Sequence, residues 1–211
     1  MRVAMIGTGY VGLVSGACFA DFGHVVTCID KDPSKIDRLE RGEIPIYEPG
    51  LDDLVAANVR EGRLFFTLDG AEAIRNADAV FIAVGTPSRR GDGFADLSYV
   101  YAAAREIAHA LDGYTVIVTK STVPVGTSHK VRDLIASLTK VPFHIADNPE
   151  FLKEGDAIND FMKPDRIVCG VESEAAAAAM RELYDPFVRN GNPIYVMDVR
   201  SAEMVKYASN A

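Results

Sequence analysis

The sequence predicts an α/β fold in which helices cover both faces of a doubly wound, mostly parallel sheet. Short apolar, β-branched runs alternate along the chain with longer stretches of helical period. The runs are apolar at nearly every position, which is typical of strands buried on both faces. A glycine-rich turn, GTGYVG at residues 7–12, directly follows the first run. Such a turn joins the first strand to the first helix in sheets of this kind.

The predicted elements alternate between strand and helix. The runs that we expect to form strands are 3–6, 25–29, 79–84, 115–119, 143–146 and 166–170. Helical period is clearest over 96–111 and 127–138, and it is followed by a helix over 173–187, a short strand over 192–197 and a final helix over 198–211. We therefore expect the doubly wound core in residues 1 to about 170, a domain that spans 1–197, and the start of a long helix at 198–211.

The composition excludes several classes of protein. The 211 residues carry a formal net charge of -8, which argues against non-specific binding to nucleic acid or to an anionic membrane. The N-terminus has no signal-peptide pattern, and no run approaches the roughly 20 apolar residues of a membrane span. Cys18, Cys28 and Cys169 are odd in number and widely spaced, which favours a reduced, cytoplasmic chain with buried cysteines.

The histidines give no sign of a metal site. His24, His109, His129 and His144 have no ligand spacing such as HxxxH. We expect them at the surface or in loops, and we expect no bound metal.

The glycine-rich turn predicts a dinucleotide site. Gly7 would permit the tight turn, Gly9 would let a pyrophosphate approach the backbone, and Gly12 would let the helix pack close to the strand. The pyrophosphate would lie at the helix N-terminus, where unpaired N–H groups favour negative charge.

The second predicted strand ends in Asp30, whose carboxylate can accept hydrogen bonds from both ribose hydroxyls and repels a 2′-phosphate. NAD is therefore preferred over NADP. Lys31 and Lys35 leave NADP open, because a nearby cation tolerates that phosphate.

Polar turns follow two later strands, GTPSRRGDG at 85–93 and KSTVPVGT at 120–127. Ligands of open α/β sheets bind beyond the carboxyl ends of the strands. Thr86 and Thr122 are thus placed to contact a cofactor, although both turns could also be ordinary loops.

The acidic stretch, residues 147–156 (DNPEFLKEGD), gathers four carboxylates around one lysine. These carboxylates repel one another, so a folding role alone explains them poorly. We expect Asp147 and Asp156 to be solvated loop acids or helix caps, and Lys153 to be a surface counter-charge.

Together these motifs resemble the UDP-glucose/GDP-mannose dehydrogenase family, and its UDP-glucose branch more than its GDP-mannose branch. The matching segments span the whole chain in the expected order: 5–16, 45–51, 81–88, 120–127, 148–155, 164–170 and 202–211. The resemblance implies a Rossmann-like NAD-binding domain, followed by the start of the family's central helix. It implies oxidation of UDP-glucose to UDP-glucuronate with two NAD and water.

The resemblance also assigns site residues. Those implied to contact NAD, besides the three glycines, are Tyr10, Val11, Asp30, Lys35, Thr86, Thr122 and Glu154. Those implied to contact the sugar nucleotide are Glu150, Phe151, Leu152, Lys153, Glu154, Lys206 and Asn210. Lys206 and Asn210 match a Lys-x-x-x-Asn pair, and their i, i+4 spacing places both on one helix face.

These residues suggest a division of chemical roles. Alcohol oxidation releases a proton as the hydride leaves, and Glu150 is the candidate to handle it through a water. Lys206 would stabilise the developing oxyanion, with Asn210 as a second donor. Thr122 is the fourth candidate catalytic residue. Glu154 is the candidate for contact with NAD or substrate.

Enzymes of this family complete the second oxidation on a cysteine in a Gly-Gly-Ser-Cys-type loop, and the chain has no such loop. We therefore expect the N-terminal part of a homodimeric enzyme, with negligible complete turnover by itself. Two alternatives stay open: a sister dehydrogenase acting on GDP-mannose or a UDP-N-acetylhexosamine, and a non-catalytic NAD-binding module.

Overall fold

One sheet of eight strands runs through the described part of the chain, in the order β3-β2-β1-β4-β5-β6-β7-β8. The computed structural model describes residues 1–91, 93–188 and 193–210, and it describes residue 210 by its backbone only. The strands are β1 (Arg2–Ile6), β2 (Val25–Ile29), β3 (Leu64–Thr67), β4 (Ala79–Ile82), β5 (Thr115–Thr119), β6 (Phe143–Asp147), β7 (Ile167–Val171) and β8 (Ile194–Met197). Strands β1 to β6 pair in parallel, so the predicted doubly wound, mostly parallel sheet is confirmed.

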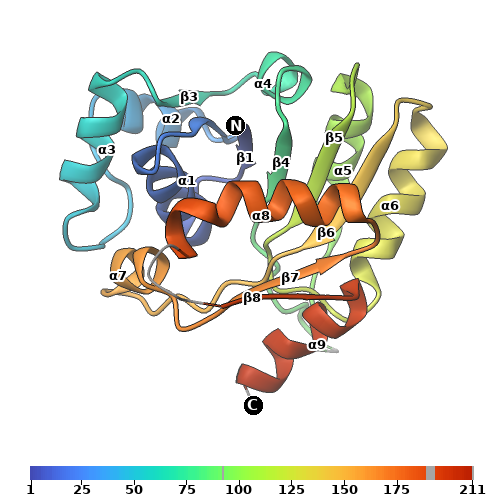
Figure 1. The fold of residues 1–211 in the computed structure, drawn as a ribbon. Coiled ribbons are helices and arrows are strands. Elements are labelled where there is room, and N and C mark those ends of the chain that lie inside the picture. Colours follow the sequence, from blue (N-terminus) through green and yellow to red (C-terminus); the bar gives the residue numbers. More distant parts are fainter. Residues whose placement is uncertain (92, 189–192, 211) are drawn as a thin grey trace.

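Helices cover both faces of this sheet (Figure 1). They are α1 (Tyr10–Asp21), α2 (Pro33–Glu40), α3 (Leu51–Arg60), α4 (Ala71–Arg75), α5 (Ser98–Ala110), α6 (Thr127–Leu138), α7 (Ala157–Met162), α8 (Glu174–Val188) and α9 (Val199–Asn210). In Figure 1, α8 lies across the front face of the sheet, and α9 leads away from it to the C-terminus.

Alternating side chains of each central strand enter two separate cores. In β1, Val3 and Met5 belong to the core beneath α1 and α8, whereas Ala4 and Ile6 belong to the core beneath α4, α5 and α6. Strands β4 and β5 divide in the same way. Both faces of the sheet are shielded from solvent, which is why these runs are apolar at nearly every position.

Strand β7 departs from the parallel pattern. It runs antiparallel to β6 and overlaps it at only two pairs, Ala146 with Val171 and Asp147 with Gly170. Its first residues therefore extend past the carboxyl end of β6 and flank the chain that follows. Strand β8 pairs in parallel with β7.

The observed bounds differ from the predicted ones mainly at strand ends. The run 79–84 is a strand only to Ile82, and the run 143–146 continues as a strand through Asp147. The first residue of the predicted strand 192–197 and the last of the predicted helix 198–211 lie outside the described residues. The sequence pattern does not predict the edge strand β3, because this strand has only four residues, of which Leu64 alone is buried.

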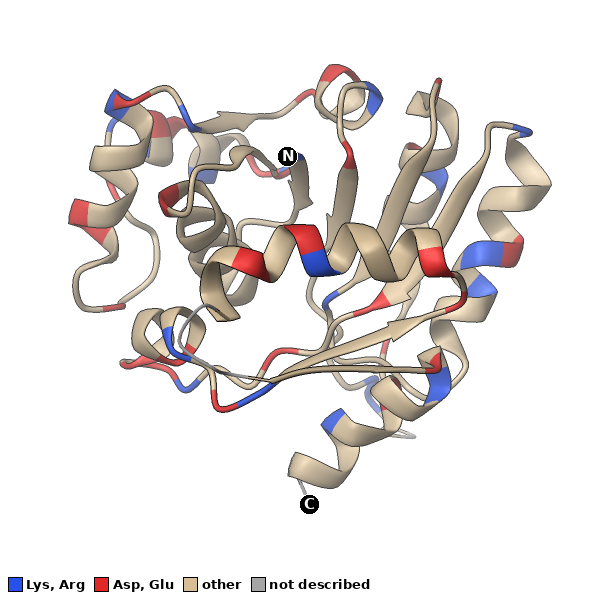
Figure 2. Ribbon diagram, viewed as in Figure 1, with Lys and Arg blue, Asp and Glu red and all other residues tan. Residues whose placement is uncertain are grey.

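Charged residues of both signs are spread over the helices and loops, whereas the visible strands are almost free of them (Figure 2). Among the described residues, no helix is both long and apolar enough to cross a membrane.

Helix α9 is fastened to the N-terminus of α6 by a buried carboxylate. Glu203 is 2% exposed, and it accepts hydrogen bonds from the backbone N–H groups of Gly126 (2.5 Å) and Ser128 (2.8 Å). Gly126 is the N-cap of α6 and has no side chain of its own with which to cap it. Glu203 therefore caps α6 from a distant part of the sequence.

Replacing Glu203 by alanine should lower the free energy of unfolding by roughly 2–4 kcal/mol, because two buried N–H groups lose their acceptor. Urea unfolding monitored by circular dichroism would measure the change. Glu203→Gln keeps one acceptor oxygen, so its free energy of unfolding should fall clearly less than that of Glu203→Ala. Equal losses in the two variants would contradict the capping role.

Candidate functional site

The glycine-rich turn has the geometry that its spacing predicts. Gly7 has φ +106°, and a Cβ there would lie 2.4 Å from the carbonyl oxygen of Ala83. A Cβ on Gly12 would lie 2.0 Å from the carbonyl oxygen of Gly7. The tight turn at Gly7 and the close helix packing at Gly12 are therefore confirmed.

Space is left at the middle glycine for an anion. A Cβ on Gly9 would meet no atom within 4 Å. Gly9 is the N-cap of α1, which has no side-chain cap and no acidic residue in its first turn. Tyr10 and Val11 follow at half-buried positions. This open, uncapped helix N-terminus fits a pyrophosphate.

Asp30 lies beside this turn at the end of β2. Its Oδ2 accepts hydrogen bonds from the backbone N–H (2.9 Å) and hydroxyl (2.6 Å) of Thr8, and its Oδ1 accepts one from the N–H of Asp32 (3.1 Å). Lys35 Nζ is 3.5 Å from Oδ2. Burial alone would raise the pKa of Asp30, but these hydrogen bonds and Lys35 together lower it. The carboxylate is thus ionised and held in place.

The two polar turns meet at the same edge. The hydroxyl of Thr86 donates to the carbonyl oxygen of Thr122 at 2.9 Å. Ser121 donates to the carbonyl oxygen of Val84 at 2.7 Å. The structure therefore brings Thr86 and Thr122 together; residue 92 of the first turn lies outside the described residues.

Glu48 ties the acidic stretch to the glycine-rich turn. Its carboxylate accepts hydrogen bonds from the backbone N–H groups of Gly155 (2.9 Å) and Ala157 (2.8 Å), and also from the hydroxyl of Tyr10. The N–H of Gly155 also donates to the Tyr10 hydroxyl oxygen at 2.8 Å. Burial and the Glu48 carboxylate raise the pKa of Tyr10 to about 12. The segment PIYEPGL carries Glu48, but its sequence alone indicated no role for this residue.

Glu150 and Lys206 form an ion pair between the acidic stretch and α9. Lys206 Nζ lies 2.9 Å from Glu150 Oε1 and donates to the Glu150 carbonyl oxygen at 2.7 Å. The N–H of Leu152 donates to Glu150 Oε2 at 2.7 Å. The Lys206 ammonium also lies 5.5 Å from the centroid of the Phe151 ring. These two predicted site residues are therefore in contact, although 56 positions separate them in the sequence.

The other residues predicted for this region are more exposed. Lys153 pairs with Asp160 at 3.3 Å and leaves most of its side chain in solvent, as expected of a surface counter-charge. Glu154 is exposed. Asp156 is exposed at the N-cap of α7 and makes no side-chain cap hydrogen bond. The side chain of Asn210 lies outside the described residues.

Two expectations about burial are wrong. Asp147 is no solvated loop acid: it lies at the end of β6 and is 2% exposed. Burial, reinforced by Glu203, raises the pKa of Asp147 well above its usual range, so the neutral acid is favoured. His24 is also buried, because the loop that carries it packs against α8, and its Nε2 lies 2.9 Å from the carbonyl oxygen of Leu183.

A buried polar network that the sequence did not reveal lies under the acidic stretch. Lys120 Nζ donates to Asn148 Oδ1 at 3.0 Å, and the hydroxyl of Tyr184 donates to the same oxygen at 2.5 Å. Asn148 Nδ2 donates to the carbonyl oxygen of Val168 at 2.8 Å. Burial lowers the pKa of Lys120 to about 8, against the raising effect of Glu150. Only the folded structure shows that Lys120 is buried, because a lysine at the end of a strand usually lies in a solvated turn.

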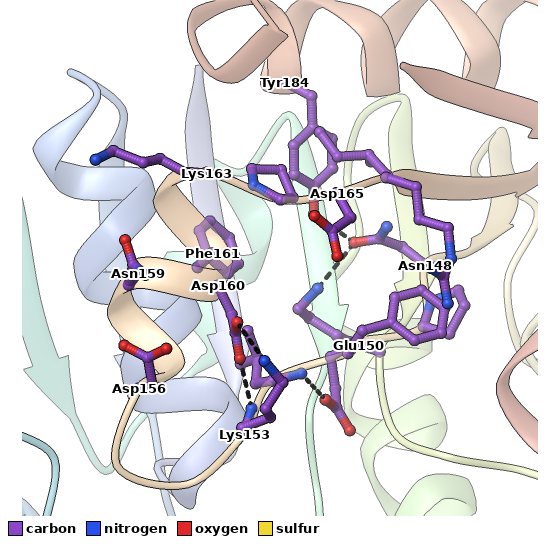
Figure 3. Close-up of a pocket in the computed structure, with 17 residues that line it drawn as sticks. Asn148, Glu150, Lys153, Asp156, Asn159, Asp160, Phe161, Lys163, Asp165 and Tyr184 are labelled. Atoms are coloured by element: carbon purple, nitrogen blue, oxygen red, sulfur yellow. Dashed lines mark hydrogen bonds and ion pairs between the residues drawn. The ribbon is translucent and has the colours of Figure 1, made fainter. Parts of the chain in front are cut away.

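The network forms the floor of a cavity of about 290 Å³. Figure 3 shows Tyr184 and Asn148 pointing toward each other, Lys153 facing Asp160, and the Glu150 carboxylate turned away from Asn148. Phe161 and Leu152 contribute apolar walls. Arg166 is an exposed lining residue, and its guanidinium lies 4.6 Å from the centroid of the Phe151 ring.

The cysteines are buried, as predicted. Burial raises the pKa of Cys28 and Cys169 to about 12 and raises that of Cys18 further. Within the described ranges, no group of three or more His, Cys, Asp or Glu side chains is placed to hold a metal ion.

Comparison with known proteins gives one consistent family. Residues 1–188 match the model of the UDP-glucose/GDP-mannose dehydrogenase family, NAD binding domain. The chain is 58% identical to a UDP-glucose 6-dehydrogenase of Rhizobium meliloti (strain 1021), over all of this chain and 49% of that protein. It thus spans about half the length of the curated relatives it matches.

Solved structures agree with this. A UDP-glucose dehydrogenase of Pyrobaculum islandicum has a TM-score of 0.94 and 45% identity, over 99% of this chain and 48% of that chain. A GDP-mannose dehydrogenase of Pseudomonas aeruginosa has a TM-score of 0.94 and 36% identity, over 100% of this chain and 49% of that chain.

Lys120→Met should raise the free energy of unfolding by up to roughly 3 kcal/mol at pH 7, and by less as the pH rises from about 8 to 10.5. An unfolded lysine keeps its proton to about pH 10.5, whereas the folded one loses it near 8. In that window the unfolded state binds more protons, so the wild type gains stability as the pH rises. Urea unfolding at pH 7 and pH 10 measures the difference. Lys163→Met, at an exposed position, is the control; a gain for Lys120→Met that did not change with pH would contradict the assignment.

Proposed function

The chain belongs to the UDP-glucose/GDP-mannose dehydrogenase family, and from that premise we propose that it is the cofactor-binding part of a UDP-glucose 6-dehydrogenase. NAD is the cofactor of this domain. The observation that carries the proposal is the contact of Lys206 with Glu150 at the carboxyl edge of the sheet. A dinucleotide site by itself needs neither residue.

In this proposal the N-terminus of α1 and the open position at Gly9 hold the pyrophosphate. Asp30 accepts hydrogen bonds from the ribose hydroxyls, with Lys35 beside it. Thr86 and Thr122 contact the cofactor from the neighbouring turns, together with Tyr10, Val11 and Glu154. When bound, NAD would supply the acceptor for the hydride that leaves the sugar's alcohol carbon.

The proton and the developing charge are handled by the chain's own residues. Glu150 takes the proton through a water, because its carboxylate is held at the edge of the sheet by Leu152 and Lys206. Lys206 stabilises negative charge on the reacting oxygen, with Asn210 as a second donor. The backbone of Phe151 and Leu152 lies against the sugar, with Lys153 at the exposed end.

UDP-glucose is proposed as the substrate because curated relatives that are 46% to 58% identical to this chain are named for it. A sister dehydrogenase remains the second candidate, since a GDP-mannose dehydrogenase has the same TM-score at lower identity. A non-catalytic NAD-binding module is less favoured, because it would not require the Lys206–Glu150 pair.

Complete oxidation to UDP-glucuronate is proposed for a longer protein that contains this chain. Cys18, Cys28 and Cys169 are buried, and their raised pKa values disfavour the thiolate. None of the three is proposed as the nucleophile of the second oxidation. The longer protein is proposed to be a cytoplasmic homodimer.

NAD should bind to the 211-residue chain more tightly than NADP does. Isothermal titration calorimetry should show saturable binding of NAD. Asp30→Ala should weaken NAD binding about tenfold or more, because the ribose loses its acceptor. Lys31→Ala is the matched control on the adjacent residue, and it should keep most of the affinity for NAD. A folded chain without any NAD binding would argue against an autonomous cofactor site.

In the longer protein, Glu150→Gln should reduce kcat for UDP-glucose about 10²–10⁴-fold, because the proton loses its acceptor. NADH formation with UDP-glucose, GDP-mannose and UDP-N-acetylglucosamine would be compared for the wild type. If kcat/KM is higher for one of the other two sugar nucleotides, that sugar nucleotide is the substrate and the proposal of UDP-glucose is wrong. Glu154→Gln, four residues away, serves as the comparison for a carboxylate expected only to bind.

A further inference from the structure

Lys120 carries a buried positive charge. It directly follows β5, is 2% exposed, and lines the cavity beneath the acidic stretch. In the part of the chain that the structure describes, no carboxylate oxygen lies within ion-pair distance of its Nζ; its hydrogen-bond partner is the Asn148 amide oxygen. Its ammonium also lies 5.5 Å from the centroid of the Phe161 ring.

The hydrogen bond of Lys120 is not needed to hold Asn148. Asn148 Oδ1 also accepts from the Tyr184 hydroxyl, and its Nδ2 donates to the carbonyl oxygen of Val168. The backbone N–H of Asn148 donates to the carbonyl oxygen of Thr119 at 2.8 Å. A neutral side chain at position 120 would leave all three contacts in place. What a lysine adds there is therefore its positive charge.

The charge of Lys120 acts mainly on the proposed site. Among the charges that affect it, Glu150 is the strongest, followed by the groups of Cys169 on β7, Asp147 on β6 and Lys206 on α9. The uncharged Tyr184 hydroxyl faces it from α8, and Cys18 lies within its influence on α1. Asp147 favours its neutral form and does not cancel the ammonium. Glu150 and Lys206 form one neutral pair, so Lys120 leaves an excess of positive charge beneath Glu150.

We propose that Lys120 is a positioning residue of the dehydrogenase site, whose ammonium acts electrostatically on the Glu150 carboxylate from beneath the acidic stretch and supports negative charge on the reacting oxygen. The inference rests on the proposed function and extends it to a residue outside the proposed cofactor and substrate contacts. In a poorly solvated site, one such charge acts over several ångströms. The effect is lost when the lysine is neutral, which ties the site to the protonation of Lys120.

The test is a pH titration of the 211-residue chain, from pH 6 to 10, that follows the side-chain carboxyl carbon of Glu150 by ¹³C NMR. Glu150→Gln identifies the signal. In the wild type the signal should shift with a midpoint near 8, where Lys120 loses its proton. In Lys120→Arg it should stay at the low-pH position, because a guanidinium keeps its charge. In Lys120→Met it should stay at the high-pH position.

These outcomes separate charge from packing, because a purely structural role would not place the arginine and methionine variants at opposite ends. Lys163→Met removes an exposed lysine of the same cavity and should keep the transition. A wild-type signal without a transition near pH 8, or a transition that persists in Lys120→Met, would overturn the inference.

The longer protein supplies the second arm. There, Lys120→Met should lower kcat roughly tenfold with little change in KM. Removing a group that donates directly to the oxyanion lowers kcat about 10²–10³-fold, so the expected loss is smaller. The wild type should lose kcat above pH 8, where Lys120 becomes neutral. Lys120→Arg should keep its kcat over the same range, because the guanidinium stays charged. A transition in the carboxyl signal without dehydrogenase activity would refute the proposed function and leave the charge coupling standing. An active enzyme without that transition would refute the role of Lys120 alone.

Discussion

The parallel pairing of β1 to β6 is the constraint on which the rest of the structure depends. Because these strands all run in one direction, their carboxyl ends lie at one edge of the sheet. The turn at Gly7, the turns that carry Thr86 and Thr122, and the acidic stretch all follow strands that end there. Both faces of the sheet are buried by helices, so this edge is where polar groups can gather around a ligand.

The reversal of β7 closes the edge on one side. Since β7 overlaps β6 by only two pairs, its first residues project beyond the edge and meet Asn148 through the carbonyl oxygen of Val168. At the other end of the acidic stretch, the Glu48 carboxylate binds the N–H groups of Gly155 and Ala157. Glu150 lies between these two anchors. A loop that is held at both ends can keep a carboxylate in place without belonging to a helix or a strand.

Helix α9 connects the two halves of the site. Glu203 and Lys206 are three residues apart and share one helix face. Glu203 caps α6, directly after the turn that carries Thr122, and Lys206 holds Glu150. A shift of α9 would therefore act on the cofactor turn and on the acidic stretch together. This helix therefore contributes to the candidate site as much as the glycine-rich turn does, although it comes last in the chain.

The sequence by itself determined the fold class, the position of the glycine-rich turn, the family, and NAD as its cofactor. These follow from local patterns: apolar runs of strand length, glycines whose spacing matches a single turn, and contiguous motifs. Tertiary structure alone decided which polar residues are buried. Asp147 and Lys120 stand in polar stretches that indicated solvent, yet α8, α9 and the reversed β7 cover them. Burial depends on segments that are far apart in the sequence, and it also changes the chemistry of the groups it covers. The pKa of Lys120 is therefore a property of the packing and not of the motif that contains it.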